Sequence, residues 1–309
     1  MQKKRVLITG ASGLLGGNLM TLLPESWGIV GLVHEHPIHS PRKRAEIRTF
    51  DLLTKNFDAL LSDLGTIDAV IHTAALTNVD LCEEKKRQSW DLNAVVTKNI
   101  ADACAKHYVH LVHISTDHIF DGKKGDYAEE DQPHPVNYYA ETKLAGEEFV
   151  RASGCHSTII RTNFFGFYIQ RKRGIAGWIL NTLKEKEPLT LFTDVRFSSI
   201  LVNDFVPAIT EVLEKGIAGT LHIAASDSCT KYEFGIKLAN AFNLDTSEII
   251  ALTLEESHLL VPRPKDMSLD IKKAQKLLSS PLPTVDQSIA RYRELMENEY
   301  PSSLKKLAL

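Results

Sequence analysis

Short runs of apolar and β-branched residues recur along the first half of the chain, and segments with a helical pattern separate several of them. These runs predict strands at residues 6–9, 29–33, 47–50, 69–72, 110–116 and 157–162. A helix is expected to follow the first run, a long helix at 83–107 precedes the fifth, and a third helix carries Tyr139. Alternation of strand and helix at this pace predicts an α/β fold with a doubly wound, Rossmann-type parallel sheet and right-handed crossovers.

Beyond residue 163 the regular alternation loosens. Predicted helices lie at 174–186, 204–215, 231–242, 269–278 and 285–297, with strands at 189–192 and 220–223. We therefore predict a sheet domain at 1–163, rejoined by about 200–225. Residues 164–199 and 226–309 are expected to form a smaller, discontinuous mixed α/β lobe that covers the carboxyl edge of the sheet and binds substrate.

Bulk properties narrow the class of protein. The chain has 309 residues and a formal charge of −3 from 36 basic and 39 acidic side chains, so no strong field attracts nucleic acid or an anionic membrane. The four cysteines lie far apart without a C-x-x-C pair, which indicates reduced thiols. The basic start MQKKRVLITG lacks the apolar core of a signal peptide, and no stretch approaches a membrane span, so a cytoplasmic protein is expected.

A glycine-rich turn follows the first strand and opens into a helix. The segment TGASGLLGGNL places Gly10, Gly13 and Gly16 in a G-x-x-G-x-x-G spacing. Glycines let the backbone turn tightly and let a pyrophosphate approach the free N–H groups of the helix, which favour an anion. A plain tight turn is the alternative, and the absence of G-K-[ST] excludes a P-loop. The predicted dinucleotide contacts in this turn are Gly10, Ser12, Gly13, Leu14 and Leu15.

The end of the second strand bears on the choice of dinucleotide. His34 stands there in place of an Asp or Glu, the residue that would bond the adenosine 2′-hydroxyl of NAD. NADP(H) is therefore the preferred cofactor and NAD(H) the alternative. Arg42, in a basic loop, is a candidate partner for the 2′-phosphate, although such runs are more often solvated. Asp51 and Leu52, after the third strand, are predicted to contact the adenine.

Histidines of the same loop raise the question of a metal site. His34, His36 and His39 have no carboxylate at ligand spacing, so no metal site is predicted. After the fourth strand, the small residues Ala74 and Ala75, with Leu76, would let the ribose and phosphates lie against the backbone; a close helix–strand contact is the alternative.

Tyr139 and Lys143 stand four residues apart in a helical pattern, so their side chains share one face. A neighbouring ammonium stabilises a phenolate, and we expect Lys143 to lower the pKa of Tyr139. Ser115 and Thr116 end the fifth strand, and in open α/β sheets that edge binds ligands. A surface Tyr and Lys on an ordinary amphipathic helix is the alternative.

The segments TGASGLLGGNL, VIHTAALTNVD, HISTDHIFDG, PVNYYAETKLAGE and VPRPKDMSLD resemble the extended short-chain dehydrogenase/reductases, and within them the dTDP-4-dehydrorhamnose reductase family. The resemblance implies a catalytic set of Thr116, Tyr139 and Lys143. It further implies that Tyr139 gives a proton to the forming alkoxide, that Thr116, with Ser115, hydrogen-bonds that oxygen, and that Lys143 holds the nicotinamide ribose. Asn93 resembles the asparagine that positions this region.

The chain also departs from that family. His118 stands where a tyrosine is usual, RTNFFGFY from Arg161 replaces the usual strand end, and the segment FTDVRFSSILVNDF is not a close copy. These changes leave the segments expected to bind the cofactor intact and affect those expected to bind the sugar. Arg196 and Arg263 are candidates to pair with a substrate diphosphate, and salt bridging at the surface or between lobes is the alternative.

The resemblance implies NADPH-dependent reduction of a 4-keto nucleotide sugar, in polysaccharide biosynthesis. Two alternatives stay open. A sugar-nucleotide epimerase or dehydratase of the same superfamily would recycle a tightly held cofactor. A non-catalytic NADP-binding regulatory subunit would resemble the beta subunit of methionine adenosyltransferase. A nucleotide sugar is thus the expected partner, and a homodimer is left open.

Overall fold

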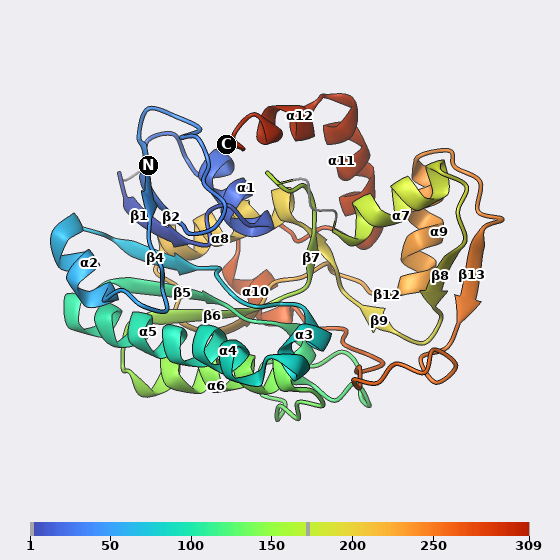
Figure 1. Cartoon of the computed structure of the whole chain (residues 1–309), viewed down its shortest axis with the longest axis horizontal. Helices are drawn as coiled ribbons and strands as arrows, with labels where there is room; N and C mark the ends of the chain where they lie inside the picture. Colours follow the sequence, from blue (N-terminus) through green and yellow to red (C-terminus); the bar gives the residue numbers. More distant parts are fainter. Residues whose placement is uncertain (1–2, 171–173, 309) are drawn as a thin grey trace.

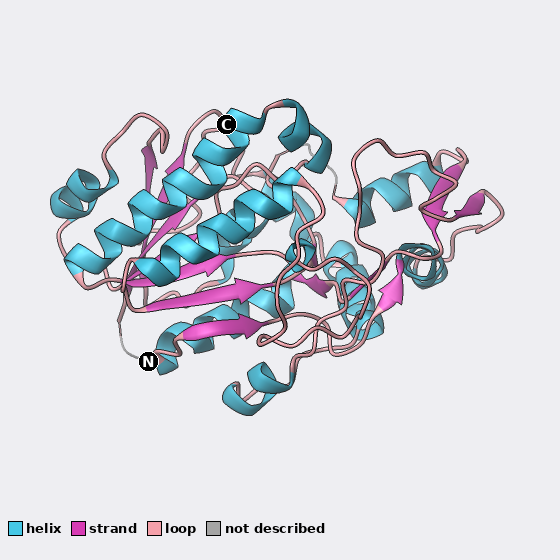
Figure 2. Cartoon of the chain, turned by 90° about the horizontal axis from the view of Figure 1, so that it is seen from below, coloured by secondary structure: helices cyan, strands magenta, loops and turns pink. Residues whose placement is uncertain are grey.

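The central sheet of the protein has seven strands, all parallel. The computed structural model describes residues 3–170 and 174–308. The strand order is β11-β6-β5-β4-β1-β2-β3, and Figure 2 shows these strands running side by side beneath long helices. Their bounds are β1 Arg5–Thr9, β2 Gly28–Val33, β3 Ala45–Thr49, β4 Ala69–His72, β5 His110–Ile114, β6 Ser157–Arg161 and β11 Gly219–His222.

Helices cover both faces of this sheet. Helices α2, α5 and α6 pack on one face, while α1 and α8 pack together on the other (Figure 1). Each face buries its own apolar core, because the strands are buried on both sides. The predicted Rossmann-type, doubly wound sheet is therefore confirmed. The bounds are α1 Leu14–Leu22, α2 Phe57–Leu64, α5 Val96–His107, α6 Tyr138–Ala152 and α8 Val202–Lys215.

The prediction of a single helix at 83–107 is wrong. The segment begins at Val79 and divides into α3 Val79–Glu84, α4 Lys86–Trp90, a π-helical turn Asp91–Val95 and α5. Asn78 caps the start by accepting a hydrogen bond from the Leu81 amide at 2.9 Å, and Lys85 leaves helical geometry with φ −114° and ψ 55°. Apolar periodicity does not reveal such a break, because residues on both sides of it keep burying one face.

The chain after residue 163 crosses between the lobe and the sheet. Helix α7 packs against α9, and β8 pairs in parallel with β13; these elements lie together at the right of Figure 1. The chain returns through α8 and β11, which adds to the sheet beside β6. The predicted helix at 269–278 is shorter and starts at Lys272, because Leu269 instead bridges Tyr127. The bounds are β7 Phe164–Phe165, α7 Ile175–Lys184, β8 Leu189–Phe192, β9 Arg196–Phe197, β10 Ile200–Leu201, β12 Cys229–Thr230, α9 Lys231–Ala241, β13 Ile249–Leu252, α10 Lys272–Leu277, α11 Val285–Glu297 and α12 Tyr300–Lys305.

A buried ion pair between Glu147 of α6 and Arg161 of β6 links this helix to the sheet. The Glu147 carboxylate accepts hydrogen bonds from Arg161 Nη2 at 2.9 Å, from the Ser115 hydroxyl at 2.6 Å and from Arg151 Nη2 at 2.7 Å. The Glu147 side chain is 0% exposed and that of Arg161 is 2% exposed. Hydrogen bonds and charge from Arg161 outweigh burial and keep the pKa of Glu147 below its usual value, although burial is the largest single influence and acts in the opposite direction. The carboxylate therefore stays charged inside the protein.

Replacing Glu147 tests this fastening. We expect Glu147→Ala to lower the free energy of unfolding by about 3–5 kcal/mol, because it leaves the Arg161 guanidinium buried without its partner. Arg151→Ala is the matched control; its side chain is 44% exposed, and the loss should be under about 1 kcal/mol. Urea unfolding followed by circular dichroism measures both. Equal losses for the two variants would contradict the assigned role of the buried pair.

Candidate functional site

The glycine turn after β1 leaves the start of α1 open. Gly10 has a positive φ of 67°, and the Gly13 amide donates to the Gly10 carbonyl at 2.9 Å. A Cβ on Gly16 would overlap the Gly10 carbonyl oxygen, so only glycine lets the helix pack this closely on the turn. Gly13 is the N-cap of α1 and supplies no side-chain hydrogen bond. The first amides of the helix are thus available to an anion, which fits the pyrophosphate of a dinucleotide.

A cavity of about 380 Å³ adjoins this turn, and most of the predicted cofactor residues line it. Its walls come from the carboxyl ends of β1, β2, β3 and β4. The predicted residues found there are Gly10, Ser12, Gly13, His34, Asp51, Leu52, Ala74, Ala75 and Leu76. Leu15 lies in the core at 3% exposure instead. The cavity fits the adenosine half of a dinucleotide, because a mostly apolar wall with a few polar groups, among them Ser12 and Asp51, meets the open helix terminus.

Arg42 lies away from this cavity. Its guanidinium Nη1 donates to the Leu23 carbonyl at 2.6 Å, and Arg42 is absent from the residues that line the described cavity. Burial lowers the pKa of Arg42. The pairing of Arg42 with a 2′-phosphate therefore stays a prediction that requires this side chain to leave Leu23. The basic side chains that do line the cavity are His34 and His36.

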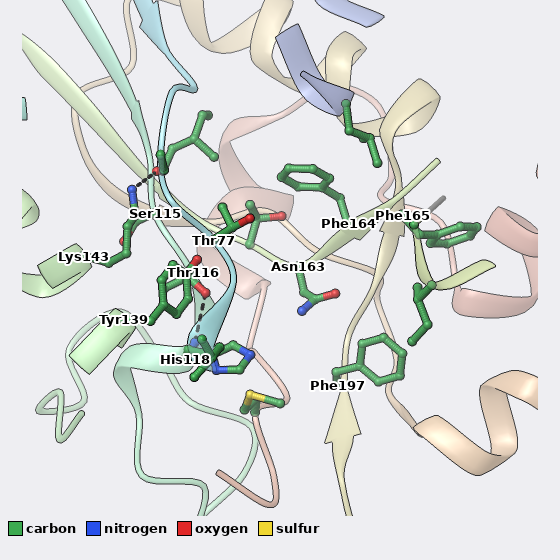
Figure 3. Close-up of a pocket in the computed structure, with 18 of the residues that line it drawn as sticks. Thr77, Ser115, Thr116, His118, Tyr139, Lys143, Asn163, Phe164, Phe165 and Phe197 are labelled. Atoms are coloured by element: carbon green, nitrogen blue, oxygen red, sulfur yellow. Dashed lines mark hydrogen bonds between the residues drawn. The ribbon is translucent and has the colours of Figure 1, made fainter. Parts of the chain in front are cut away.

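A second cavity, of about 340 Å³, continues from the first toward the lobe (Figure 3). Thr73 and Ala75 line both cavities, so one ligand can extend through them. The sheet domain contributes Leu14, Ser115, Thr116, Tyr139 and Lys143, and the lobe contributes an apolar wall. Its phenylalanines are Phe164, Phe165 and Phe197. The predicted catalytic residues thus lie between a cofactor-sized cavity and the substrate-side lobe.

Tyr139 lies in the first turn of α6. Asn137 caps that helix by accepting from the Ala140 amide at 3.0 Å, and the Tyr139 side chain points toward Thr116 in Figure 3. The expected lowering of the Tyr139 pKa by Lys143 is wrong for this structure. Burial raises the pKa of Tyr139, and the Thr116 hydroxyl opposes that shift only in part. The phenol is therefore protonated at neutral pH.

Lys143 lies one helical turn after Tyr139 and is 3% exposed. Its ammonium donates to the Ile114 carbonyl at 2.8 Å, the dashed line at the left of Figure 3. Burial lowers the pKa of Lys143 to about 8, and the charge of Glu147 opposes the shift. Because its ammonium bonds to the end of β5, the side chain is held at the edge of the cavity.

Ser115 and Thr116 differ in their bonding. The Ser115 hydroxyl donates to Glu147 at 2.6 Å. The Thr116 hydroxyl donates to Asp117 at 3.1 Å and accepts from the His118 amide at 3.2 Å. Both line the cavity. Thr116 is the nearer of the two to Tyr139 in Figure 3, so it is better placed to share a substrate oxygen with the phenol.

Asn93 joins the loop after β4 to helix α6, which carries Tyr139 and Lys143. It lies in the π-helical turn, where its amide oxygen accepts from the Leu76 amide at 2.8 Å and its nitrogen donates to the Leu76 carbonyl at 3.0 Å. The same nitrogen donates to Thr142 of α6 at 3.0 Å. This placement agrees with a positioning role, since one buried side chain ties the loop after β4 to α6.

The two candidate substrate arginines make contacts within the protein. Arg196 donates to the Ser228 carbonyl at 3.0 Å and lies 3.5 Å from Glu233. Arg263 forms an ion pair with Asp80 at 2.8 Å. Neither is among the described residues that line the second cavity. Their pairing with a diphosphate stays a prediction, and the alternative of salt bridging matches the contacts observed.

Sequence reasoning missed several polar residues of the second cavity region. Burial raises the pKa of Asp117 to about 7, and its carboxylate accepts from Asn163 Nδ2 at 3.0 Å. His118 lies edge-on to Tyr139, with ring centroids 5.7 Å apart, and burial lowers its pKa to about 3, so the imidazole is neutral. Lys231 enters from the lobe. Asp117 was visible in the STD segment, whereas Asn163 and Lys231 carry no local signal.

Residues 3–170 and 174–308 lack two features that belong to other classes of protein, a metal-ligating cluster and a membrane-spanning helix. No group of three or more potential metal-binding side chains is found there. Within the same residues, no helix combines the length and apolar character needed to cross a bilayer.

The parallel sheet, the open glycine turn and the Tyr139–Lys143 pair at the sheet's carboxyl edge define an extended short-chain dehydrogenase/reductase. Within that class the chain belongs to the family described as RmlD substrate binding domain, whose sequence model matches residues 4–297.

Known proteins resemble the chain over nearly its whole length. A hypothetical dTDP-4-dehydrorhamnose reductase from Sulfolobus tokodaii is 35% identical, with a TM-score of 0.81 over 91% of this chain and 97% of its own. The dTDP-4-dehydrorhamnose reductase of Bacillus anthracis, solved with NADP, is 26% identical, with a TM-score of 0.82 over 95% of this chain and 99% of its own.

Curated relatives include two kinds of protein. The probable low-salt glycan biosynthesis reductase Agl14 of Haloferax volcanii is 28% identical over 92% of this chain and 95% of its own length. The methionine adenosyltransferase 2 subunit beta of Xenopus laevis is 29% identical over 89% of this chain and 82% of its own. The chain is therefore similar both to a protein named as a reductase and to a protein named as a subunit of another enzyme.

Substitution of His34 tests whether the protein prefers NADPH or NADH. We expect His34→Asp to weaken NADPH binding about tenfold or more and to improve NADH binding, because a carboxylate repels a 2′-phosphate and bonds a 2′-hydroxyl. Fluorescence titration gives both dissociation constants. His39→Asp, on the same loop but outside the cavity lining, should leave their ratio unchanged. Parallel weakening of both cofactors in His34→Asp would count against this assignment.

Proposed function

We propose that the protein is an NADPH-dependent reductase of a 4-keto nucleotide sugar. The observation that carries the proposal is the position of Thr116, Tyr139 and Lys143, which line one cavity that continues into the cavity beside the glycine turn. A dinucleotide laid along the turn would bring its nicotinamide to these three side chains. The names of several relatives support the substrate class and a place in polysaccharide synthesis.

The cofactor would be held by the residues of the first cavity, and when bound it supplies the hydride for the reduction. Tyr139 donates its phenolic proton to the oxygen of the substrate carbonyl as that oxygen gains negative charge. The Thr116 hydroxyl hydrogen-bonds the same oxygen from the end of β5. The raised pKa of Tyr139 suits this direction of reaction, because a proton donor must hold its proton in the resting state.

Lys143 has one task in this proposal. Its ammonium, which donates to the Ile114 carbonyl at 2.8 Å, would hold the nicotinamide ribose. Lowering the pKa of Tyr139 is not part of that task, because burial raises the pKa of the phenol. The apolar wall of phenylalanines keeps water from the reacting carbonyl and strengthens the hydrogen bonds to it.

A second candidate function is a cofactor-binding regulatory subunit. Methionine adenosyltransferase 2 subunit beta from Xenopus laevis is similar to the chain over 294 residues, which favours this reading. Co-purification with a synthetase, together with no turnover of any keto sugar, would support it. An epimerase or dehydratase is distinguished from a reductase by the cofactor, since stoichiometric NAD retained through purification favours recycling.

The catalytic role of the phenol is tested by Tyr139→Phe. We expect kcat for NADPH oxidation to fall at least about a hundredfold, because the general acid is lost, while NADPH binding changes little. A panel of 4-keto nucleotide sugars that includes dTDP-4-dehydrorhamnose supplies the substrates. Tyr138→Phe is the matched control, since the neighbouring phenol is absent from the cavity lining, and it should retain activity. No turnover of any panel member by the wild-type protein would overturn the proposal.

The pH profile tests Lys143. Because burial lowers its pKa to about 8, its positive charge is lost as pH rises through that value, and kcat/KM should decline above about pH 8.

The stability of the folded protein should respond to pH in the opposite direction, increasing where kcat/KM declines. An unfolded lysine keeps its proton up to about pH 10.4. Between about pH 8 and pH 10.4 the unfolded state therefore binds more protons at this residue than the folded state does. The contribution of Lys143 to the free energy of unfolding should thus increase as pH rises through that range.

Lys143→Met should abolish most of the activity and remove the alkaline decline from what remains. Lys98→Met is the control, because Lys98 is 48% exposed and pairs with Asp102 on the surface. An unchanged alkaline decline in Lys143→Met would assign it to another group. Steady-state kinetics and thermal melts at the same pH values separate lost activity from unfolding.

A further inference from the structure

Lys231 brings a positive charge into the second cavity from the lobe. It is the first residue of α9, and its backbone amide is fixed by a hydrogen bond to the Val195 carbonyl at 2.9 Å. Among the described residues that line the cavity, Lys143 and Lys231 are the two with an ammonium group. Since the Lys143 ammonium bonds the Ile114 carbonyl at 2.8 Å, Lys231 is the cation available on the substrate side.

The Lys231 ammonium has no anionic partner in the folded chain. Across residues 3–170 and 174–308 it forms neither a side-chain hydrogen bond nor an ion pair within 4.0 Å. The ammonium lies over the Phe192 ring, 5.9 Å from the ring centroid. The acidic neighbour Glu233 faces elsewhere, since its carboxylate accepts from the Thr230 amide at 2.7 Å and lies 3.5 Å from Arg196.

This position is unfavourable for a cation. The N-terminus of a helix carries a partial positive charge, so an ammonium in the first turn is repelled by it. Burial lowers the pKa of Lys231, as does the positive charge of Arg263, and Asp117 counteracts them only in part. The Lys231 side chain is partly exposed, and a partly buried cation without a partner is still unfavourable in the folded protein, so an anionic ligand would stabilise it.

Asp117 does not fill the role of partner. One of its oxygens accepts from the Thr116 hydroxyl at 3.1 Å and the other from Asn163 at 3.0 Å. Burial raises its pKa to about 7, so at neutral pH it carries only part of a negative charge. The wall around Lys231 therefore retains positive charge. Nearby Phe197 and Met267 are apolar, which excludes water and strengthens any charge interaction there.

Arg196 and Arg263 are not available for the same task. Arg196 donates to the Ser228 carbonyl at 3.0 Å, and Arg263 pairs with Asp80 at 2.8 Å. Both are absent from the described lining of the cavity. A nucleotide sugar that places its keto carbon at Tyr139 must leave its phosphates farther along the cavity, on the side of the lobe.

We propose that Lys231 binds the diphosphate of the nucleotide sugar and is a specificity-determining residue of the substrate site. This inference rests on the proposed function, because it takes a nucleotide sugar as the ligand. The ammonium donates hydrogen bonds to phosphate oxygens at the lobe side of the cavity, where Lys231 is part of the lining. Lys231 thereby takes the role that the sequence suggested for Arg196 and Arg263.

Calorimetric titration with dTDP and with UDP, on the full chain saturated with NADPH, tests the inference without turnover. In Lys231→Met the dissociation constant of the nucleoside diphosphate should rise about tenfold or more, because a hydrogen bond to a charged group is lost. The affinity for NADPH should not change. Lys231→Arg should restore much of the binding. Lys237→Met, on the same helix but paired with Asp286 at 2.7 Å, should bind like the wild type.

Three results would overturn the inference. The first is absence of measurable binding of either diphosphate to the wild type. The second is unaltered binding by Lys231→Met. The third is unaltered diphosphate binding combined with weaker binding of a nucleotide-linked uronic acid, which would assign Lys231 to a carboxylate on the sugar. A fourth result separates the two proposals. If diphosphate binding depends on Lys231 but no keto sugar is reduced, the reductase proposal is wrong and the inference about Lys231 is supported.

Discussion

The buried carboxylate of Glu147 is the constraint on which the site depends. It accepts hydrogen bonds from Ser115 at the end of β5 and from Arg161 at the end of β6, and so fixes α6 against two neighbouring strands. Lys143 and Tyr139 lie one and two helical turns before it on the same helix. Their distance from the strand ends is therefore set by an ion pair that water does not reach, rather than by contacts at the surface.

Burial also sets the electrostatics of the proposed catalytic region. It raises the pKa of Tyr139 and lowers that of Lys143, so each side chain is pushed toward its neutral form. It raises the pKa of Asp117 and lowers that of His118 as well. A site with so little fixed charge interacts strongly with any charge that a ligand brings, because few ions or waters are present to screen it. Lys231 stands out against this background as the cation that enters from the lobe.

Local patterns predicted the sheet domain well, and the reason is visible in particular elements. The glycine turn, the strand before it and the Tyr–Lys spacing are each set by residues within a few positions of one another. The break at Lys85, between α3 and α4, was missed because residues on both sides of it bury the same face. The direction of the Tyr139 pKa shift was also missed, since it depends on burial by segments remote in sequence. The placement of Arg196 failed to follow from sequence for the same reason: its partner Ser228 is 32 residues away.

The sequence by itself determined the family and the class of fold, and it supplied the residues proposed for proton transfer, because short motifs encode turns, strand ends and helical faces. The tertiary structure decided which charged groups face the cavity. Asp80 takes Arg263, Glu233 lies beside Arg196, and Lys231 is left facing the cavity. Which cation faces the cavity therefore depends on which cations find an anionic partner elsewhere in the fold. Asp80 and Arg263 are more than a hundred residues apart, and they pair only once the lobe has folded against the sheet.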